Sequence, residues 1–151
     1  MIKETAEQVE IRHTVRRFAQ EVVAGYAYEI DRDERFPVES WEQGAELGFL
    51  GITAPEELGG AGLGLTEMCI VGEELAAVCM STSATLLHQA DMVVDSIVRN
   101  GTEDQKERFL PSLCDGSVIS CLAITEPEAG SDALSMRTTA REVDGGWVLN
   151  G

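Results

Sequence analysis

Apolar residues recur at helical spacing through the first two-thirds of the chain. Ile11, Val15, Phe18, Val22 and Tyr26 are three or four residues apart, which places them on one face of a long helix. Further stripes follow at the same spacing, so the sequence predicts a helical N-terminal region. These stripes are Trp41, Ala45 and Phe49; Met68, Val71, Leu75 and Val78; and Leu86, Ala90, Val93 and Ile97.

Turn and cap residues predict where these helices begin and end. Pro37 interrupts the first helix and suits the first turn of the next. The stretch GITAPEELGGAGLGL, residues 51–65, predicts a loop, and Thr66 can cap the helix that follows it. The glycines of this stretch do not fit a phosphate-binding loop, because no strand precedes them and no Lys-Ser/Thr pair follows.

The last helix has clear signals at both ends. Asn100-Gly101 is a helix stop, and Thr102-Glu-Asp-Gln105 is a capping box in which the Thr102 hydroxyl accepts from the Gln105 amide. The Gln105 side chain can reach back to the Thr102 N–H. Pro111 is expected to break or kink this helix near Leu110.

After Gly116 the pattern changes from helical period to strand period. VISCLAIT, residues 118–125, is β-branched and apolar, SMRTTAREV alternates, and Asp144-Gly145-Gly146 is a turn before WVLNG. We therefore expect an all-helical domain over residues 1–116 and the first strands of a β-domain over residues 117–151. Two or three strands rarely stand alone in water, so the chain is expected to be part of a longer protein.

Composition narrows the range of partners. The formal net charge of −16 argues against nucleic acid and anionic membrane surfaces. The acidic start MIKETAEQVE resembles neither a secretory signal nor a transit peptide, which favours a cytoplasmic location. The four cysteines form no C-x-x-C pair and have no histidine at ligand spacing, so we expect no metal site and reduced, mostly buried thiols.

The stretch CLAITEPEAGSD, residues 121–132, carries the candidate chemistry. An apolar strand-like run ends in Thr-Glu-Pro, and a small-residue loop, Gly-Ser-Asp, follows. Residue types alone favour a buried strand and a turn. Such a strand could equally deliver backbone and hydroxyl groups to a planar ligand that bears phosphate.

Four stretches, in order, resemble the acyl-CoA dehydrogenase family. LAITEPEAGSD is similar to the family's signature, and the other three stretches are APEELGGAGLGLTEM, NGTEDQKERFLPSLCDG and DGGWVLNG. The resemblance implies an N-terminal helical domain followed by the start of a middle, β-barrel-like domain. It also implies α,β-dehydrogenation of an acyl-CoA, as in fatty-acid β-oxidation, with non-covalent FAD, transfer of electrons to an electron-transfer flavoprotein, and a homotetramer.

The resemblance also implies roles for particular residues. Along the flavin would lie Leu122, Ala123, Ile124, Thr125, Gly130 and Ser131, with Ser131 also near substrate. Leu122 stands where the family usually has an aromatic residue, so a ring contact is missing. Glu126 and Asp132 are interpreted as shaping the turn and loop, with Pro127 fixing the turn.

The acyl pocket is expected on the helix that contains residues 82–100, with candidates Thr85, Leu87, His88 and Met92. His88 is either near the floor of an acyl tunnel or a partly exposed helix residue. No catalytic residue is nominated, because the family's carboxylate base lies beyond position 151, and the 151-residue piece alone is expected to be inactive. An oxidase or hydroxylase of the same fold, and a non-catalytic helical interaction module, stay open as alternatives.

Overall fold

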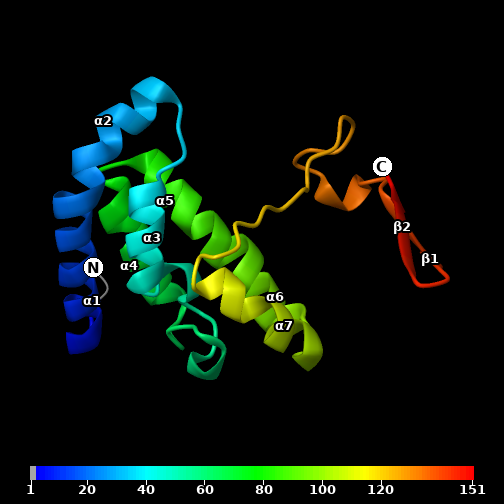
Figure 1. Cartoon of the computed structure of the whole chain (residues 1–151), viewed down its shortest axis with the longest axis horizontal. Helices are drawn as coiled ribbons and strands as arrows, with labels where there is room; N and C mark the ends of the chain where they lie inside the picture. Colours follow the sequence, from blue (N-terminus) through cyan, green and yellow to red (C-terminus); the bar gives the residue numbers. More distant parts are fainter. Residues whose placement is uncertain (1–2) are drawn as a thin grey trace. The chain divides into compact units, whose positions relative to one another are not determined.

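The computed structural model describes residues 3–151 and divides into two compact units, one ending at Cys121 and the other spanning Leu122–Gly151. No helix in this range is long and apolar enough to cross a membrane. The first unit is helical and the second contains a β-hairpin (Figure 1), as the sequence predicts. The α-helices are α1 (Ala6–Phe18), α2 (Ala24–Asp33), α3 (Val38–Glu46), α4 (Leu65–Ala76), α5 (Met80–Leu87), α6 (Asp95–Asn100) and α7 (Glu103–Cys114).

Two π-helical turns join α-helices into longer rods and change which residues are buried. The turn η1 (Ala19–Val23) links α1 to α2, and η4 (His88–Val94) links α5 to α6. Because a π turn holds an extra residue, the apolar stripe is displaced by one position. Val23 is fully buried where Val22 was expected, and Val94 is fully buried where Val93 was expected.

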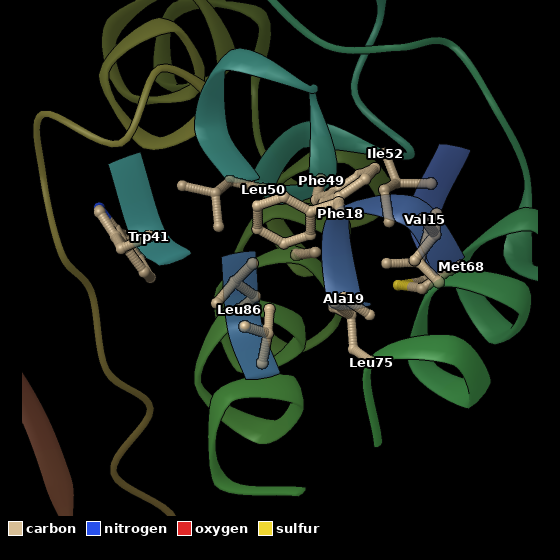
Figure 2. Packing of buried hydrophobic residues seen from close by; sticks show 13 residues of the cluster. Val15, Phe18, Ala19, Trp41, Phe49, Leu50, Ile52, Met68, Leu75 and Leu86 are labelled. Carbon is tan, nitrogen blue, oxygen red and sulfur yellow. The ribbon is translucent and has the colours of Figure 1, made fainter. Parts of the chain in front are cut away.

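The main core of the helical unit forms between α1 with η1, α4 and α5. Figure 2 shows Phe18 and Phe49 side by side at its centre, and their rings meet edge to face with centroids 5.5 Å apart. Around them pack side chains from every predicted stripe. These include Val15, Trp41, Leu50, Met68, Leu75 and Leu86. The helical stripes were therefore predicted correctly apart from the one-residue displacement.

Two predictions of helix ends need correction. The capping box at Thr102 is confirmed, with 3.3 Å from the Gln105 N–H to the Thr102 hydroxyl and 2.9 Å for the return bond. However, α4 begins two residues earlier than expected: its N-cap is Gly64, whose N–H donates to the Glu67 carboxylate, and not Thr66. Pro111, which was expected to break or kink α7, does not break it, because α7 continues through Pro111 to Cys114.

The loop before α4 contains two short 3₁₀ turns, η2 (Phe49–Gly51) and η3 (Glu56–Leu58), and close backbone contacts. A Cβ placed on Gly60 would lie 2.1 Å from the Ala54 carbonyl oxygen, so only glycine fits there. Gly59, with φ of +87°, ends the second turn in a left-handed conformation. The glycines of this loop thus serve chain packing, as expected for a helix connector.

Cysteine burial differs from the prediction. Cys114 is buried, Cys79 is half-buried, and Cys69 and Cys121 are exposed, so the thiols are not mostly buried. Burial raises the pKa of Cys114 to about 11, which keeps that thiol protonated. The other thiols lie at positions where the described chain offers less apolar cover.

Residues 118–125 form no strand, contrary to the prediction, because a strand requires a neighbouring backbone and none of the described residues supplies one. The hairpin itself is confirmed. Strand β1 (Thr139–Val143) pairs antiparallel with β2 (Gly146–Asn150), and Val143 lies opposite Gly146. The turn places Gly145 at φ of +76°, a conformation that favours glycine. A short 3₁₀ turn, η5 (Ala133–Ser135), precedes the hairpin.

A carboxylate bound by two arginines joins α1 to α4. Glu74, only 8% exposed, accepts hydrogen bonds from Arg12 and from Arg16, which contacts both of its oxygens at 2.7 Å. Glu4 and Glu73 bind the other side of Arg12. The Arg16 hydrogen bonds, with help from Arg12, hold the pKa of Glu74 below its usual value.

We predict that Glu74→Gln lowers the free energy of unfolding at pH 7 by about 2 kcal/mol, because two guanidinium groups lose their charged partner. The contribution of Glu74 is fully present above its unfolded-state pKa of about 4.3 and is lost as the pH falls through its lowered folded-state pKa. The difference between the variant and the unaltered protein should therefore shrink in acid. Urea denaturation of both proteins between pH 3 and pH 7 measures this difference in the free energy of unfolding. Glu73→Gln, at a carboxylate whose side chain is 66% exposed, is the control, and an equal loss from both would contradict this role.

Candidate functional site

The segment Leu122–Thr125 presents free backbone groups. Its N–H and C=O groups make no hydrogen bond with any residue that the structure describes. Leu122 and Ile124 are 42% and 40% exposed although both side chains are apolar. Backbone polar groups normally find partners, so this run of free donors and acceptors beside exposed apolar side chains can pair with a neighbouring strand or with a planar, hydrogen-bonding ligand.

A tight turn follows this segment directly. The N–H of Glu126 donates to the Ala129 carbonyl at 3.0 Å, and the N–H of Ala129 donates back at 3.2 Å. Pro127 occupies the first of the two turn positions, where its fixed φ is favourable. Ala129 is only 3% exposed, so this turn is a packed element of the second unit.

The Glu126 carboxylate closes the loop that the turn begins. It accepts from the backbone N–H of Arg137 at 2.8 Å and from that of Thr138 at 2.9 Å, and the Thr138 hydroxyl donates to it as well. These bonds, the one from Arg137 above all, hold the pKa of Glu126 below its usual value. Glu126 is thus an ionised group that shapes the loop, which is the role the sequence indicates.

Gly130 and Ser131 lie at the open side of this loop. A Cβ added to Gly130 would meet no atom within 4 Å, so the space beside its backbone is free for a ligand to approach. Ser131 is exposed, and its hydroxyl has no hydrogen bond to the described residues. Asp132 accepts from the Ser135 hydroxyl and caps the short turn η5. A free hydroxyl beside an uncovered glycine fits a phosphate or carbonyl oxygen.

This donor set fits an FAD molecule chemically. The isoalloxazine ring has hydrogen-bonding groups along one edge, which free N–H and C=O groups of residues 122–125 can match. The pyrophosphate requires N–H and O–H donors, which the loop at Gly130 and Ser131 offers. The six residues predicted for the cofactor all belong to the second unit, and each is exposed in the described chain.

The four acyl-pocket candidates belong to the helical unit and face different surroundings. His88 is exposed and Met92 is 38% exposed, both within the π turn η4. Thr85 is half-buried, and its hydroxyl donates to the Ser81 carbonyl at 2.8 Å, so it already has a partner. The helix therefore groups Thr85, His88 and Met92 at spacings of three and four residues.

Leu87 points into a groove between α4 and α5. This groove has a volume of about 450 Å³ and is lined by Leu65, Met68, Cys69, Gly72, Glu73, Leu87 and Asp91. Leu87 lies against Gly72, where an added Cβ would be 2.8 Å from the leucine side chain. The lining of the groove is mainly apolar, and its two carboxylates are those of Glu73 and Asp91. A second cavity of about 240 Å³, beside α1 and residues 47–63, contains none of the predicted site residues.

Gln89 is a residue with a clear structural role that the sequence interpretation missed. Its side chain, 2% exposed, forms four hydrogen bonds to Leu113, Val118 and Ser120. The available signal was its spacing of three residues from Leu86, which puts a polar residue on the buried face of the helix. Trp41 makes a similar contact, donating from its indole nitrogen to the Gly116 carbonyl at 2.9 Å.

Comparison with known proteins gives one consistent result. The family described as "Acyl-CoA dehydrogenase, N-terminal domain" matches residues 5–117. A mitochondrial 2-methylacyl-CoA dehydrogenase from Solanum tuberosum is 44% identical over 95% of this chain and 35% of its own length. The chain thus spans about a third of that relative.

Solved structures give the same match. A glutaryl-coenzyme A dehydrogenase in complex with glutaryl-CoA superposes with a TM-score of 0.93 and 31% identity, over 100% of this chain and 39% of that one. A structure titled as the electron transferring flavoprotein of Acidaminococcus fermentans superposes with a TM-score of 0.92 and 32% identity, over 100% and 40% of the two chains.

We predict that Glu126→Ala opens the loop between the turn and the hairpin, because the N–H groups of Arg137 and Thr138 lose their acceptor. Their amide protons should exchange with solvent about tenfold faster, a change that NMR-detected hydrogen exchange measures. Glu128→Ala is the matched control, since Glu128 contacts only the exposed Arg137 side chain. Unchanged exchange at both amides in Glu126→Ala would show that the carboxylate does not hold the loop.

Proposed function

This chain belongs to the acyl-CoA dehydrogenase family, and we propose that the complete protein removes two hydrogens from the Cα–Cβ bond of an acyl-CoA. FAD, when bound, would supply the acceptor for the β-hydrogen, which leaves as hydride. Electrons would then pass to an electron-transfer flavoprotein. The observation that carries this proposal is the run of free backbone groups at Leu122–Thr125, in the stretch that resembles the family signature, within a chain that is 44% identical to a 2-methylacyl-CoA dehydrogenase over 95% of its length.

In this proposal the second unit binds and orients the flavin. The N–H and C=O groups of residues 122–125 would pair with the edge of the ring system, and Ile124 would cover its apolar surface. The Thr125 hydroxyl and amide would stabilise the negative charge that develops on the ring as hydride arrives. Ser131 would donate to the pyrophosphate or to a substrate oxygen, and Gly130 would let the backbone come close.

The helical unit would supply one wall of the acyl pocket. Leu87 lies in the groove beside α4, and His88 and Met92 lie on the same helix. A bulky His88 favours a short or polar acyl group, and a 2-methylacyl-CoA dehydrogenase is among the similar proteins. We therefore propose a short, branched acyl-CoA as the substrate class. The carboxylate base, the rest of the flavin site and a homotetramer contact would come from the remainder of the protein, and a cytoplasmic location stays a prediction.

We predict that the complete protein is yellow and that one short acyl-CoA bleaches its flavin band under anaerobic conditions. The measurement is the visible spectrum before and after addition of acyl-CoAs of increasing length and branching. Reoxidation by oxygen within seconds would indicate an oxidase in place of a dehydrogenase. A colourless protein would contradict the proposed function. A yellow protein whose flavin band no acyl-CoA bleaches would support FAD binding but contradict acyl-CoA as the substrate.

We predict that His88→Gly in the complete protein shifts the preference toward longer acyl chains by at least one carbon, because it removes bulk beside the acyl chain. The values of kcat/KM across a series of straight-chain acyl-CoAs measure the shift. Ser96→Gly is the control, since it weakens the same continuous helix by a similar amount, about 0.5 kcal/mol, at an exposed position away from these candidates. An unchanged profile in His88→Gly would mean that His88 is only a surface residue.

A further inference from the structure

Gln89 uses the whole hydrogen-bonding capacity of its side chain. The amide nitrogen donates to the carbonyls of Leu113 and Val118, each at 2.8 Å. The amide oxygen accepts from the Ser120 N–H at 2.9 Å and from the Ser120 hydroxyl at 2.8 Å. Two donors and two acceptor sites are therefore all paired inside a side chain that is 2% exposed.

The chemistry of the partners dictates which way the amide faces. Two of them are carbonyls, which can only accept, and the Ser120 N–H can only donate. The opposite orientation would place the amide oxygen against two carbonyl oxygens and leave the Ser120 N–H facing an N–H₂ group. No other residue type of this length provides both donors and acceptors in one plane.

The contact with Val118 and Ser120 has the pattern of a parallel β-ladder. In extended backbone, the carbonyl of one residue and the N–H of the residue two positions on point to the same side, and one residue of a parallel neighbouring strand binds both. The Gln89 amide takes that neighbour's place. It thereby fixes the direction and the register of the backbone at Ile119 and Ser120, two residues before Leu122.

The register at Ser120 determines which backbone groups the next residues present. Successive residues of an extended chain alternate in direction, so a displacement by one position exchanges the groups that face each side. The free N–H and C=O groups of residues 122–125 are the proposed contacts to the flavin edge. Gln89 is therefore a clamp that fixes the backbone register at the point where the chain enters that segment.

Gln89 lies at the start of the π turn η4, on the buried face of the helix. Gln89 and Ala90 are both buried within η4, and Val94 follows on the same side. The extra residue of the π turn widens the helix there, and such turns are often found at functional sites. Leu87 and His88, two of the acyl-pocket candidates, immediately precede Gln89, so one turn of helix carries both the acyl wall and the clamp.

We propose that Gln89 is a positioning residue: its side-chain amide holds residues 118–120 in register, so that the following segment presents its backbone to the flavin. This inference rests on the proposed function. Among the described residues the Gln89 side chain hydrogen-bonds to none of residues 122–125, and it acts through Val118 and Ser120.

The test replaces Gln89 by Met in the complete protein, which keeps the length of the side chain and removes all four hydrogen bonds. We expect the amides of residues 120–125 to exchange with solvent about tenfold faster in the FAD-free protein. We also expect FAD to bind about tenfold more weakly, and flavin reduction by the best acyl-CoA of the panel to slow by about tenfold to a hundredfold. The apparent Kd for that acyl-CoA should change by less than about threefold.

Glu74→Gln serves as the matched control, because it removes buried hydrogen bonds between α1 and α4 and contacts neither residues 118–120 nor the acyl candidates. It should leave amide exchange at residues 120–125, FAD affinity and the reduction rate unchanged. If Gln89→Met does not fold, Ser120→Ala removes only the hydroxyl bond and should weaken FAD binding about twofold to threefold.

Faster exchange with unchanged FAD affinity and reduction rate would overturn the proposal, because the clamp would then be purely structural. Unchanged exchange would also overturn it, by showing that Gln89 does not hold the segment. If the unaltered protein binds no FAD, the proposed function fails and the positioning role fails with it. The exchange experiment distinguishes that case, because it reports on the clamp without flavin.

Discussion

The chain leaves α7 after Cys114, and several backbone groups between Asp115 and Ser120 are bound by side chains. Trp41 donates to the Gly116 carbonyl, Asp115 accepts from the Ser117 N–H, and Gln89 binds Val118 and Ser120. Gly116 has φ of +75°, and a side chain there would press on Trp41 and Leu50. The path is thus held by side chains from α3 and η4 and by Asp115 at the end of α7, which give its backbone groups the partners they need.

Much of the helical unit could be predicted because burial of apolar side chains imposes a period on the sequence. The stripes, the helix stop at Gly101 and the capping box at Thr102 depend on local chemistry alone. The π turns could not be predicted, because they follow from tertiary packing and not from any residue that prefers them. Their effect is visible in two places, where Val23 and Val94 are buried in place of their neighbours. The start of α4 was missed although its signal is local, since the Glu67 carboxylate accepts from the Gly64 N–H three residues before it.

The candidate site was predicted through its resemblance to a family and not through its residue types. Leu122, Ile124 and Thr125 alone suggest a buried strand, yet the structure leaves their backbone groups free and their side chains exposed. What the sequence did indicate correctly is the chemistry of the loop, where Glu126 and Pro127 shape a turn. Gln89 was missed because an isolated polar residue in a helix gives no hint of its partner, here 31 positions away.

Placing the clamp on the helix of the acyl candidates has a mechanistic consequence. Hydride transfer requires the acyl chain and the acceptor to be held within a fraction of an ångström of a reactive geometry. An acyl wall and a flavin segment held by separate loops would move independently. Their displacements from the reactive geometry would then add. Leu87, His88 and Gln89 are consecutive residues of one helix, and the Gln89 amide binds Val118 and Ser120. The acyl candidates and the chain that leads to Leu122 are thus held by the same rigid element of the helical unit.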